Sequence, residues 1–260
     1  MKTTVKVLDG KFDIEMLTVG SGEPLLFLHN SFGLLPAEPF LDELGKDFKV
    51  YAPHFPGYGD STGGQHIYDI FDAALFYHQL MDELGLESAN IMGHAMGGML
   101  AAEIAALDPH RAKKLVLAAP EGFWIDSAPC PDLFAAMPAD LAHLLFFSTE
   151  FPMAKMMSTL PTDNDVLQTI YVERAKRFAT AGKLVWPLPD RGLKKRAYRI
   201  KAPTLLLWGE ADRMVPPVYA KEFSSRIKNS KTEIIKQAGH MLMYEQPEAF
   251  VSAVKKFLKG

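Results

Sequence analysis

The sequence has a single cysteine, no long apolar run and no excess of charge of one sign. Cys130 alone cannot form an intramolecular disulfide, which excludes a disulfide scaffold. No apolar run approaches the roughly 20 residues that cross a bilayer, and the start of the chain lacks the apolar core of a signal peptide. Lys and Arg number 28 against 31 Asp and Glu, so the net charge of -3 attracts neither nucleic acid nor an anionic membrane. We therefore expect a cytoplasmic protein whose partner is a small molecule.

The composition is that of a globular protein with one large core. Hydrophobic residues make up 48% of the 260 residues and charged residues 23%, which excludes a disordered or collagen-like chain. The sequence also holds 13 Met and 17 Phe, and many of them fall between Glu121 and Met157. Their position therefore bears on the organisation of the chain.

Short apolar runs alternate with stretches of helical periodicity along most of the chain. The first two predicted strands, Thr4–Leu8 and Phe12–Val19, are joined at Asp9-Gly10, a pair typical of a tight hairpin turn. Continuously apolar runs then predict strands buried on both faces, at Leu25–Leu28, Phe48–Ala52, Ala89–Met92, Lys114–Ala119, Thr204–Trp208 and Glu233–Ile235. Helices are predicted at Ile67–Leu84, Met99–Leu107, Val218–Ile227 and Pro247–Leu258. The alternation indicates an α/β fold with a mostly parallel central sheet flanked by helices.

The interval from 121 to 201 contains no predicted strand. Structureless loops of that length are uncommon inside compact domains, so we predict an inserted set of helices. We interpret them as a cap, or lid, with the prolines around Cys130 and the prolines Pro187 and Pro189 as its hinges. The plainer alternative is an ordinary helical layer whose Met and Phe side chains fill core. The predicted domains are a core of residues 1–120 and 202–260 and a helical cap of residues 121–201.

A run of basic residues without an acidic one ends this interval. It comprises Arg191, Lys194, Lys195, Arg196, Arg199 and Lys201. We interpret the run as a solvated helix face that leads into the next strand. The functional alternative is an anchor for a substrate carboxylate.

The most specific motif is Ile91-Met-Gly-His-Ala-Met-Gly-Gly-Met99, which follows a predicted strand and opens a predicted helix. This is the context of a nucleophile elbow. Gly93, Gly97 and Gly98 allow the strand and the helix to pass closely. The central residue of such an elbow is a nucleophile, but here it is Ala95, whose methyl group cannot attack a substrate.

These residues resemble the α/β-hydrolase superfamily, whose usual Gly-His-Ser-Met-Gly-Gly differs from this stretch at position 95 alone. Four further segments resemble, in order, the family's strand into the oxyanion loop, its next turn, its acid segment and its histidine segment: Leu25–Asn30, Ala52–Ser61, Leu207–Pro216 and Ala238–Pro247. The resemblance covers nearly the whole chain and implies the α/β-hydrolase fold. Asn30 stands where Gly is usual and His54 where Asp is usual. These two departures indicate that the entrance of the site and the oxyanion loop differ from those of the common type.

The resemblance also implies roles for the catalytic machinery. His240 is expected to be the general base and Asp212 the acid that orients it, in the chain order that this fold uses. Glu210 lies near Asp212 in the sequence but is not expected to be the acid that orients His240. Backbone amides of Ser31 and Met96 are expected to form the oxyanion hole.

Other polar residues of these segments are expected to be auxiliary. Phe32 is the reserve amide donor of the oxyanion hole. His94 and His29 are expected to be structural, because their usual places lie behind the elbow and inside the oxyanion loop. The other histidines do not pair at metal-ligand spacing, so we expect neither a metal nor a cofactor. Cys130 has no surroundings that would activate a thiol.

The substrate is less defined by the sequence than the machinery. The predicted substrate contacts are Asn30, Phe32, Trp124, Phe146 and Met241. Flexible Met and aromatic side chains favour an apolar acyl or aryl group. A carboxylic ester or lactone is the leading substrate class, with the C–C bond of a ring-cleavage product and perhydrolysis as alternatives. The oligomeric state stays open.

Two interpretations of Ala95 compete. In the first, the native residue is serine and the alanine was introduced, a deletion used to trap intact substrate. In the second, the alanine is natural and the protein is a non-catalytic ligand-binding protein or receptor. We favour the first, because a base, an orienting acid and strained elbow glycines serve no purpose in a protein without catalysis. An aspartate nucleophile is a third case, but Met-Gly-Gly after position 95 favours serine.

Overall fold

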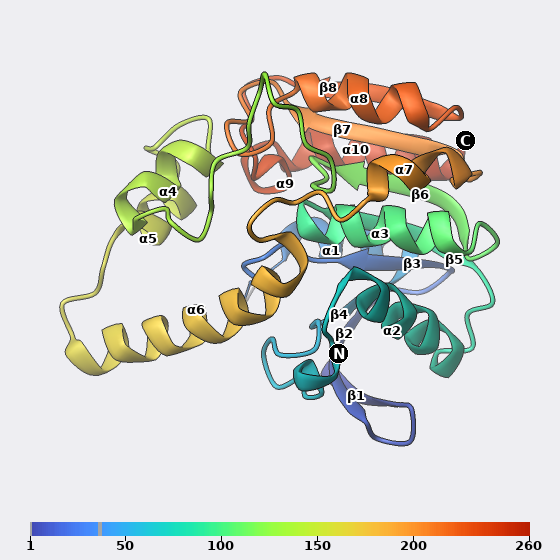
Figure 1. Cartoon of the computed structure of the whole chain (residues 1–260), viewed down its shortest axis with the longest axis horizontal. Coiled ribbons are helices and arrows are strands. Elements are labelled where there is room, and N and C mark those ends of the chain that lie inside the picture. The colour runs from blue at the N-terminus through green and yellow to red at the C-terminus, as the bar shows by residue number, and fades with distance from the viewer. Residues whose placement is uncertain (1, 36–37) are drawn as a thin grey trace.

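The computed structural model describes residues 2–35 and 38–260, with one mixed sheet at its centre (Figure 1). The strands of this described part follow the order β1-β2-β4-β3-β5-β6-β7-β8. Neighbouring strands from β4 across β3 to β8 are parallel, whereas β1 pairs with β2 and β2 with β4 in antiparallel fashion. The bounds are β1 Lys2–Val7, β2 Phe12–Val19, β3 Glu23–Leu28, β4 Phe48–Pro53, β5 Ala89–His94, β6 Ala112–Ala118, β7 Thr204–Gly209 and β8 Ser230–Ile235. The predicted α/β fold with a mostly parallel sheet is confirmed.

The N-terminal hairpin differs slightly from its prediction. The predicted strand Thr4–Leu8 is observed as β1, which ends at Val7, because Leu8 and Asp9 adopt φ angles of 52° and 55°. Gly10 follows with φ of 85°. The turn therefore uses three consecutive left-handed residues, and not the Asp9-Gly10 pair alone.

One of the predicted buried strands is exposed. The run Glu233–Ile235 belongs to β8, in which only Ile235 is buried, so the prediction of a strand covered on both faces is wrong here. β8 is an edge strand that pairs with β7 alone. By contrast, every residue of β5 and β7 in the middle of the parallel region is buried.

Helices flank this sheet. α3 packs on β3, β5 and β6 and against α2, whereas α1 packs on β4 and against α10. The bounds are α1 Pro39–Gly45, η1 Gly64–His66, α2 Ile70–Glu83, α3 Met96–Leu107, α8 Val218–Arg226, α9 Leu242–Glu245 and α10 Pro247–Lys259. The predicted Ile67–Leu84 helix begins at Ile70 because the Asp69 carboxylate caps it. The short α1 was not predicted, since two turns show too little periodicity.

Residues 121–201, all of which the structure describes, form helices and loops and no strand. The helices are α4 Pro138–Leu145, α5 Pro152–Ser158, α6 Asn164–Val185, α7 Leu193–Arg196 and η2 Ala197–Arg199. Figure 1 shows α4, α5 and α6 to one side of the sheet, with α6 reaching away from it. The buried residues of α6 all lie in its last six positions, from Thr180 to Val185. The part of α6 before Thr180 therefore has no buried residue, and we call this part the arm.

The Met and Phe residues of this segment have mixed surroundings. Met137 and Met156 are 64% and 62% exposed, and Phe147 is 43% exposed. Phe123 stacks on Phe223 of α8, at 3.9 Å between ring centroids. Only part of the surplus Met and Phe thus faces the interior, because the arm and the connecting loops leave the others in solvent.

The basic run attaches residues 121–201 to the sheet layer. The Arg196 guanidinium binds the buried Glu103 carboxylate of α3 at 2.9 and 2.5 Å. The Arg199 Nε donates to the Ala106 carbonyl at the end of the same helix. A purely solvated face is therefore the wrong description of these two arginines, whose partners lie on α3.

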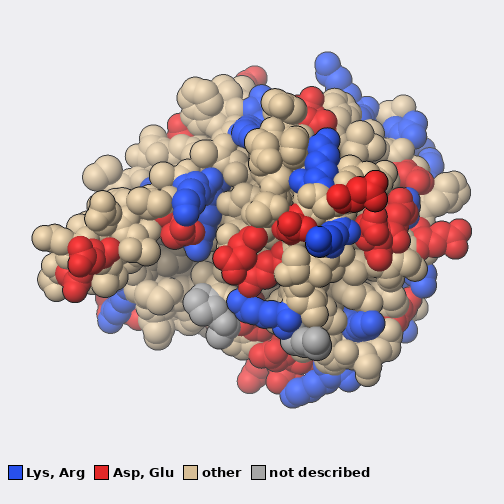
Figure 2. All heavy atoms as spheres, turned by 90° about the horizontal axis from the view of Figure 1, so that it is seen from below, with Lys and Arg blue, Asp and Glu red and all other residues tan. Residues whose placement is uncertain are grey.

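Acidic and basic side chains are interspersed on the face that Figure 2 shows, with neither sign forming a large patch of its own. Among the described residues, no helix is both long and apolar enough to span a membrane.

Candidate active site

A sharp turn connects β5 to α3 at Ala95. This residue has φ of 51° and ψ of -114°, a conformation that side-chain-bearing residues rarely adopt. A Cβ on Gly93 would lie 2.1 Å from the Gly97 carbonyl oxygen, and one on Gly97 would lie 2.1 Å from the Leu28 carbonyl oxygen. The strand and the helix therefore cross at backbone contact, which presents position 95 at the carboxyl ends of the parallel strands. This is the geometry of the predicted elbow.

The predicted base and acid lie together. Asp212 follows β7, His240 follows β8, and His240 Nδ1 lies 2.9 Å from Asp212 Oδ2. The other carboxylate oxygen of Asp212 accepts hydrogen bonds from the amides of Met214 and Val215, at 2.9 and 2.8 Å. Glu210 instead accepts a hydrogen bond from a backbone amide of the next loop.

The Asp212 carboxylate determines the protonation behaviour of His240. Burial disfavours a charged His240 ring, but the carboxylate and its hydrogen bond outweigh burial and raise the pKa of His240 above its ordinary value. A carboxylate that holds Nδ1–H leaves Nε2 free to accept a proton.

A chain of hydrogen bonds joins the loop after β3 to His240. The Phe32 amide donates to Asn30 Oδ1 at 2.8 Å, and Asn30 Nδ2 lies 3.0 Å from His94 Nδ1. His94 Nε2 lies 2.9 Å from the His240 carbonyl oxygen. Burial holds the pKa of His94 well below its ordinary value, so the ring is neutral and accepts at Nδ1 while donating at Nε2. His94 thus positions the His240 backbone, a role that local sequence context did not reveal.

The side chains of Ser31 and Met96, whose amides are the candidate oxyanion donors, contact each other. Met96 is the first residue of α3, so its amide has no partner within the helix. Ser31 Oγ lies 3.8 Å from Met96 Sδ, and the Tyr58 hydroxyl donates to the Ser31 carbonyl oxygen at 3.1 Å. The Phe32 amide, the reserve donor, is occupied by Asn30.

The histidine at the start of this loop is structural, as expected. The Phe55 amide donates to His29 Nε2 at 3.0 Å, and His29 Nδ1 lies 2.7 Å from the Asn30 carbonyl oxygen. Burial lowers the pKa of His29 to about 3, which keeps the ring neutral. His54, at the other departure from the family pattern, lies 3.6 Å from a Glu15 carboxylate oxygen.

A small inner cavity brings half of the predicted site residues together. It has a volume of about 10 Å³, the space of one water molecule. The predicted residues in its lining are Asn30, Ser31, Phe32, Ala95 and His240. Four lining residues were missed by the sequence analysis: Glu121, Leu133, Leu145 and Met214.

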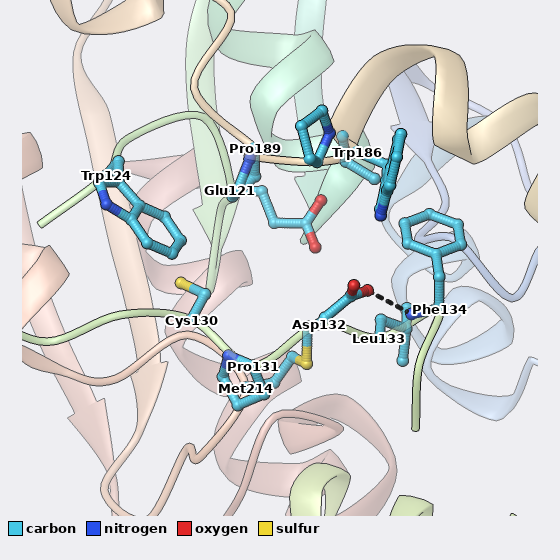
Figure 3. A pocket seen from close by; sticks show the side chains of 12 residues that line it. Glu121, Trp124, Cys130, Pro131, Asp132, Leu133, Phe134, Trp186, Pro189 and Met214 are labelled. Atoms are coloured by element: carbon cyan, nitrogen blue, oxygen red, sulfur yellow. Dashed lines mark hydrogen bonds between the residues drawn. The ribbon is translucent and has the colours of Figure 1, made fainter. Parts of the chain in front are cut away.

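A second cavity of about 130 Å³ adjoins the first, and the two share Glu121, Leu133 and Met214. Figure 3 shows its walls, which include the predicted contact Trp124 as well as Trp186.

The predicted substrate contacts Phe146 and Met241 line neither cavity. Phe146 is fully buried and stacks on Phe151, while its neighbour Leu145 reaches the inner cavity. Met241 packs behind Asn30, whose Nδ2 lies 3.8 Å from the Met241 sulfur. Adjacent residues of a helix end or turn face different sides, which the sequence pattern alone does not resolve.

Glu121 is the most unusual residue of the site. It directly follows Pro120 after β6, and its amide donates to the Ala95 carbonyl oxygen at 3.1 Å. The side chain belongs to a residue only 6% exposed, and no described residue supplies a hydrogen-bond partner to its Oε2. Burial raises the pKa of Glu121 to about 7. Its place at the carboxyl end of the strand next to the elbow was the sequence signal that could have identified it.

The single cysteine also lines the outer cavity, where it remains a thiol. Burial raises the pKa of Cys130 to about 12. A thiol of such high pKa is a poor nucleophile at neutral pH.

Comparison with known proteins identifies the family. Residues 23–247 match the model of the alpha/beta hydrolase fold, which is most of the chain. The chain belongs to the α/β-hydrolase family.

Two relatives of this chain are named for different activities. The chain is 27% identical to a dihydrolipoyllysine-residue acetyltransferase component of an acetoin cleaving system from Cupriavidus necator, over 93% of this chain and 65% of that protein. It is 26% identical to a 2-hydroxy-6-oxo-6-phenylhexa-2,4-dienoate hydrolase from Burkholderia cepacia, over 95% of this chain and 91% of that protein. The chain thus spans slightly less than two thirds of the first relative and nearly all of the second.

Solved structures show the same fold. A membrane phospholipase A matches with a TM-score of 0.83 and 24% identity, over 100% of this chain and 86% of that chain. A meta-cleavage product hydrolase from Pseudomonas fluorescens, a serine-to-alanine mutant complexed with acetates, matches with a TM-score of 0.79 and 19% identity, over 99% and 97%. An enol-lactonase from Burkholderia xenovorans matches with a TM-score of 0.77 and 19% identity, over 99% and 100%.

The close crossing at the elbow predicts the effect of a single methyl group. Gly97→Ala should destabilise the fold by roughly 3 kcal/mol or more, because the new Cβ has rigid backbone on its far side. Gly182→Ala is the matched control: its Cβ would meet only Phe134 at 3.9 Å, and alanine should stabilise α6 by about 1 kcal/mol. Urea unfolding monitored by circular dichroism measures both. Equal stability of the two variants would contradict the crossing.

Burial of Glu121 predicts a pH-dependent loss of stability. The carboxyl has a pKa of about 7 when folded against 4.5 ordinarily, so the folded state binds this proton more tightly. Its contribution to folding is therefore lost as the pH rises from about 4.5 through 7, by up to about 3 kcal/mol. Near pH 5, Glu121→Gln should be about as stable as the parent. At pH 8, Glu121→Gln should be more stable than the parent. Parallel pH profiles of the two unfolding free energies would contradict this expectation.

Proposed function

We propose that this chain, with serine at position 95, is a hydrolase of carboxylic esters or lactones, and that with Ala95 it binds substrate without turning it over. One observation carries the proposal. His240, hydrogen-bonded to the buried Asp212 carboxylate, lines the same inner cavity as position 95. A base with a free Nε2 beside a nucleophile position is the arrangement that acyl transfer requires.

The proposed reaction has two steps. In the first, His240 Nε2 takes the proton of the serine hydroxyl as its oxygen attacks the substrate carbonyl, and the amides of Met96 and Ser31 hold the oxyanion. The carbonyl re-forms, the leaving alkoxide takes the proton from His240, and an acyl-enzyme remains. In the second, His240 takes a proton from water as the water oxygen bonds to the acyl carbon. The bond from that carbon to the serine oxygen then breaks, His240 gives its proton to the serine oxygen, and the free acid leaves. Asp212 keeps the ring oriented and stabilises the imidazolium throughout.

Residues 121–201 serve as the cap of this site in our proposal. Leu133 and Leu145 from this segment line the inner cavity. The Arg177 guanidinium of α6 donates to the Phe32 carbonyl oxygen at 3.0 Å, and the Phe178 ring lies 6.0 Å from that of Phe32. These contacts support a segment that covers the oxyanion loop and whose movement admits substrate.

The substrate class rests on the relatives and on the cavity. The relatives are named for a dienoate and, among solved structures, for a meta-cleavage product and an enol-lactone. The outer cavity has aromatic walls that suit an apolar acyl or aryl group. An ester or lactone therefore remains the leading class, with hydrolysis of a C–C bond as the alternative.

Serine as the native residue is supported by the strained elbow. Ala95 keeps an unfavourable backbone conformation whose purpose is to expose a nucleophile. A solved relative carries the same kind of change, serine to alanine, together with bound acetates. The competing function is a natural ligand receptor, which Ala95 itself favours.

Restoring the hydroxyl tests the proposal. Ala95→Ser should raise the hydrolysis of short p-nitrophenyl esters by roughly 10⁶-fold over the parent, the scale of loss when a serine nucleophile is removed. Its kcat/KM should fall as the pH drops through the raised pKa of His240, because the imidazolium cannot take a proton.

Ala95→Ser combined with His240→Ala is the control and should remain inactive. A folded Ala95→Ser protein that fails on p-nitrophenyl esters, enol-lactones and vinylogous diketones would contradict the enzyme and favour the receptor.

A further inference from the structure

The Glu121 side chain lies between the two cavities with nothing in the described protein to bind its Oε2. Figure 3 shows the carboxyl pointing into the outer cavity, among Trp124, Trp186 and Phe134. Its amide is bonded to the Ala95 carbonyl oxygen, so the side chain is anchored next to the reaction centre.

Two carboxylate oxygens of the described residues are buried without a hydrogen-bond partner, Asp13 Oδ1 and Glu121 Oε2, and of these two acids only Glu121 lines the two cavities. The Glu103 carboxylate binds the Arg196 guanidinium, and Glu38 accepts from the Tyr244 hydroxyl at 2.7 Å. Buried polar atoms are hydrogen-bonded as a rule, because desolvation otherwise costs about 1–3 kcal/mol each. A buried acid that destabilises the protein by this amount at the wall of a cavity is suited to bind a ligand whose donor group supplies the missing hydrogen bond.

The residues around Glu121 determine which kind of ligand group can form a hydrogen bond with its carboxylate. Of the described residues that line the two cavities, none is Lys or Arg. The nearby guanidinium groups of Arg177 and Arg213 bind backbone carbonyls instead. A second acid, Asp132, lines the outer cavity. A carboxylate on the substrate would therefore face acidic groups without a counter-ion.

We propose that Glu121 is the specificity-determining residue of the site: it accepts a hydrogen bond from a hydroxyl or ammonium donor on the acyl part of the substrate and rejects acyl groups that end in a carboxylate. The inference rests on the proposed function for the placement of the ester at position 95. The aromatic walls hold the apolar part of the acyl group between the reaction centre and this donor.

The experiment measures binding to the chain as it stands, so no turnover is needed. Titration calorimetry compares four methyl benzoates, each as the meta and the para isomer, that carry a hydroxymethyl, an aminomethyl, a methyl or a carboxylate group on the ring. At least one donor ester should bind about tenfold more tightly than the methyl and carboxylate esters. The hydroxymethyl and aminomethyl arms distinguish a hydroxyl from an ammonium donor.

Variants assign the preference to Glu121. Glu121→Leu should abolish the preference and strengthen binding of the carboxylate ester. Glu121→Gln, of equal shape, should keep a hydroxyl preference through its carbonyl oxygen but lose an ammonium preference. Glu87→Gln, an exposed acid outside both cavity linings, is the matched control and should bind like the parent.

The outcomes separate this inference from the proposed function. Equal binding of all four esters, no measurable binding of either donor ester, or a preference that survives Glu121→Leu would overturn the role of Glu121. Hydrolysis by Ala95→Ser without a donor preference would overturn this role alone. A donor preference in a chain that Ala95→Ser fails to activate would keep the role of Glu121 and overturn the hydrolase.

Discussion

The backbone crossing of β5 and α3 is the constraint on which the rest of the site depends. Gly93 and Gly97 leave no room for a side chain, so the chain must turn within one residue. That residue, Ala95, takes the strain as a positive φ. At the same turn, the Ala95 carbonyl oxygen accepts a hydrogen bond from the Glu121 amide. Without the crossing, the Glu121 amide would not reach the Ala95 carbonyl oxygen.

Hydrogen bonds then connect this turn to the catalytic candidates on neighbouring loops. Asp212 holds one side of His240, and His94 holds its backbone and, through Asn30, the loop that carries Phe32. Burial makes this series of hydrogen bonds rigid, because the neutral His94 ring can neither gain a proton nor turn without losing a hydrogen-bond partner. Asn30, a departure from the family pattern, is thus a connecting residue of this chain.

Much of the fold followed from local patterns. Apolar runs and helical periodicity located the strands and the main helices, since both report burial along the chain. The errors have local causes as well: β8 lies at the sheet edge, so its apolar residues are exposed, and α1 is too short for a period. Phe146 and Met241, predicted as substrate contacts, line neither of the two cavities.

The sequence by itself determined the order of elements, the glycines that demand the elbow and the succession of position 95, Asp212 and His240. Only the tertiary structure decided that Asn30 and His94 support His240, and that Glu121 stands at the cavity without a partner among the described residues. The physical reason is distance along the chain. A motif reports neighbours in sequence, whereas hydrogen bonding and desolvation depend on groups that the fold brings together from remote strands.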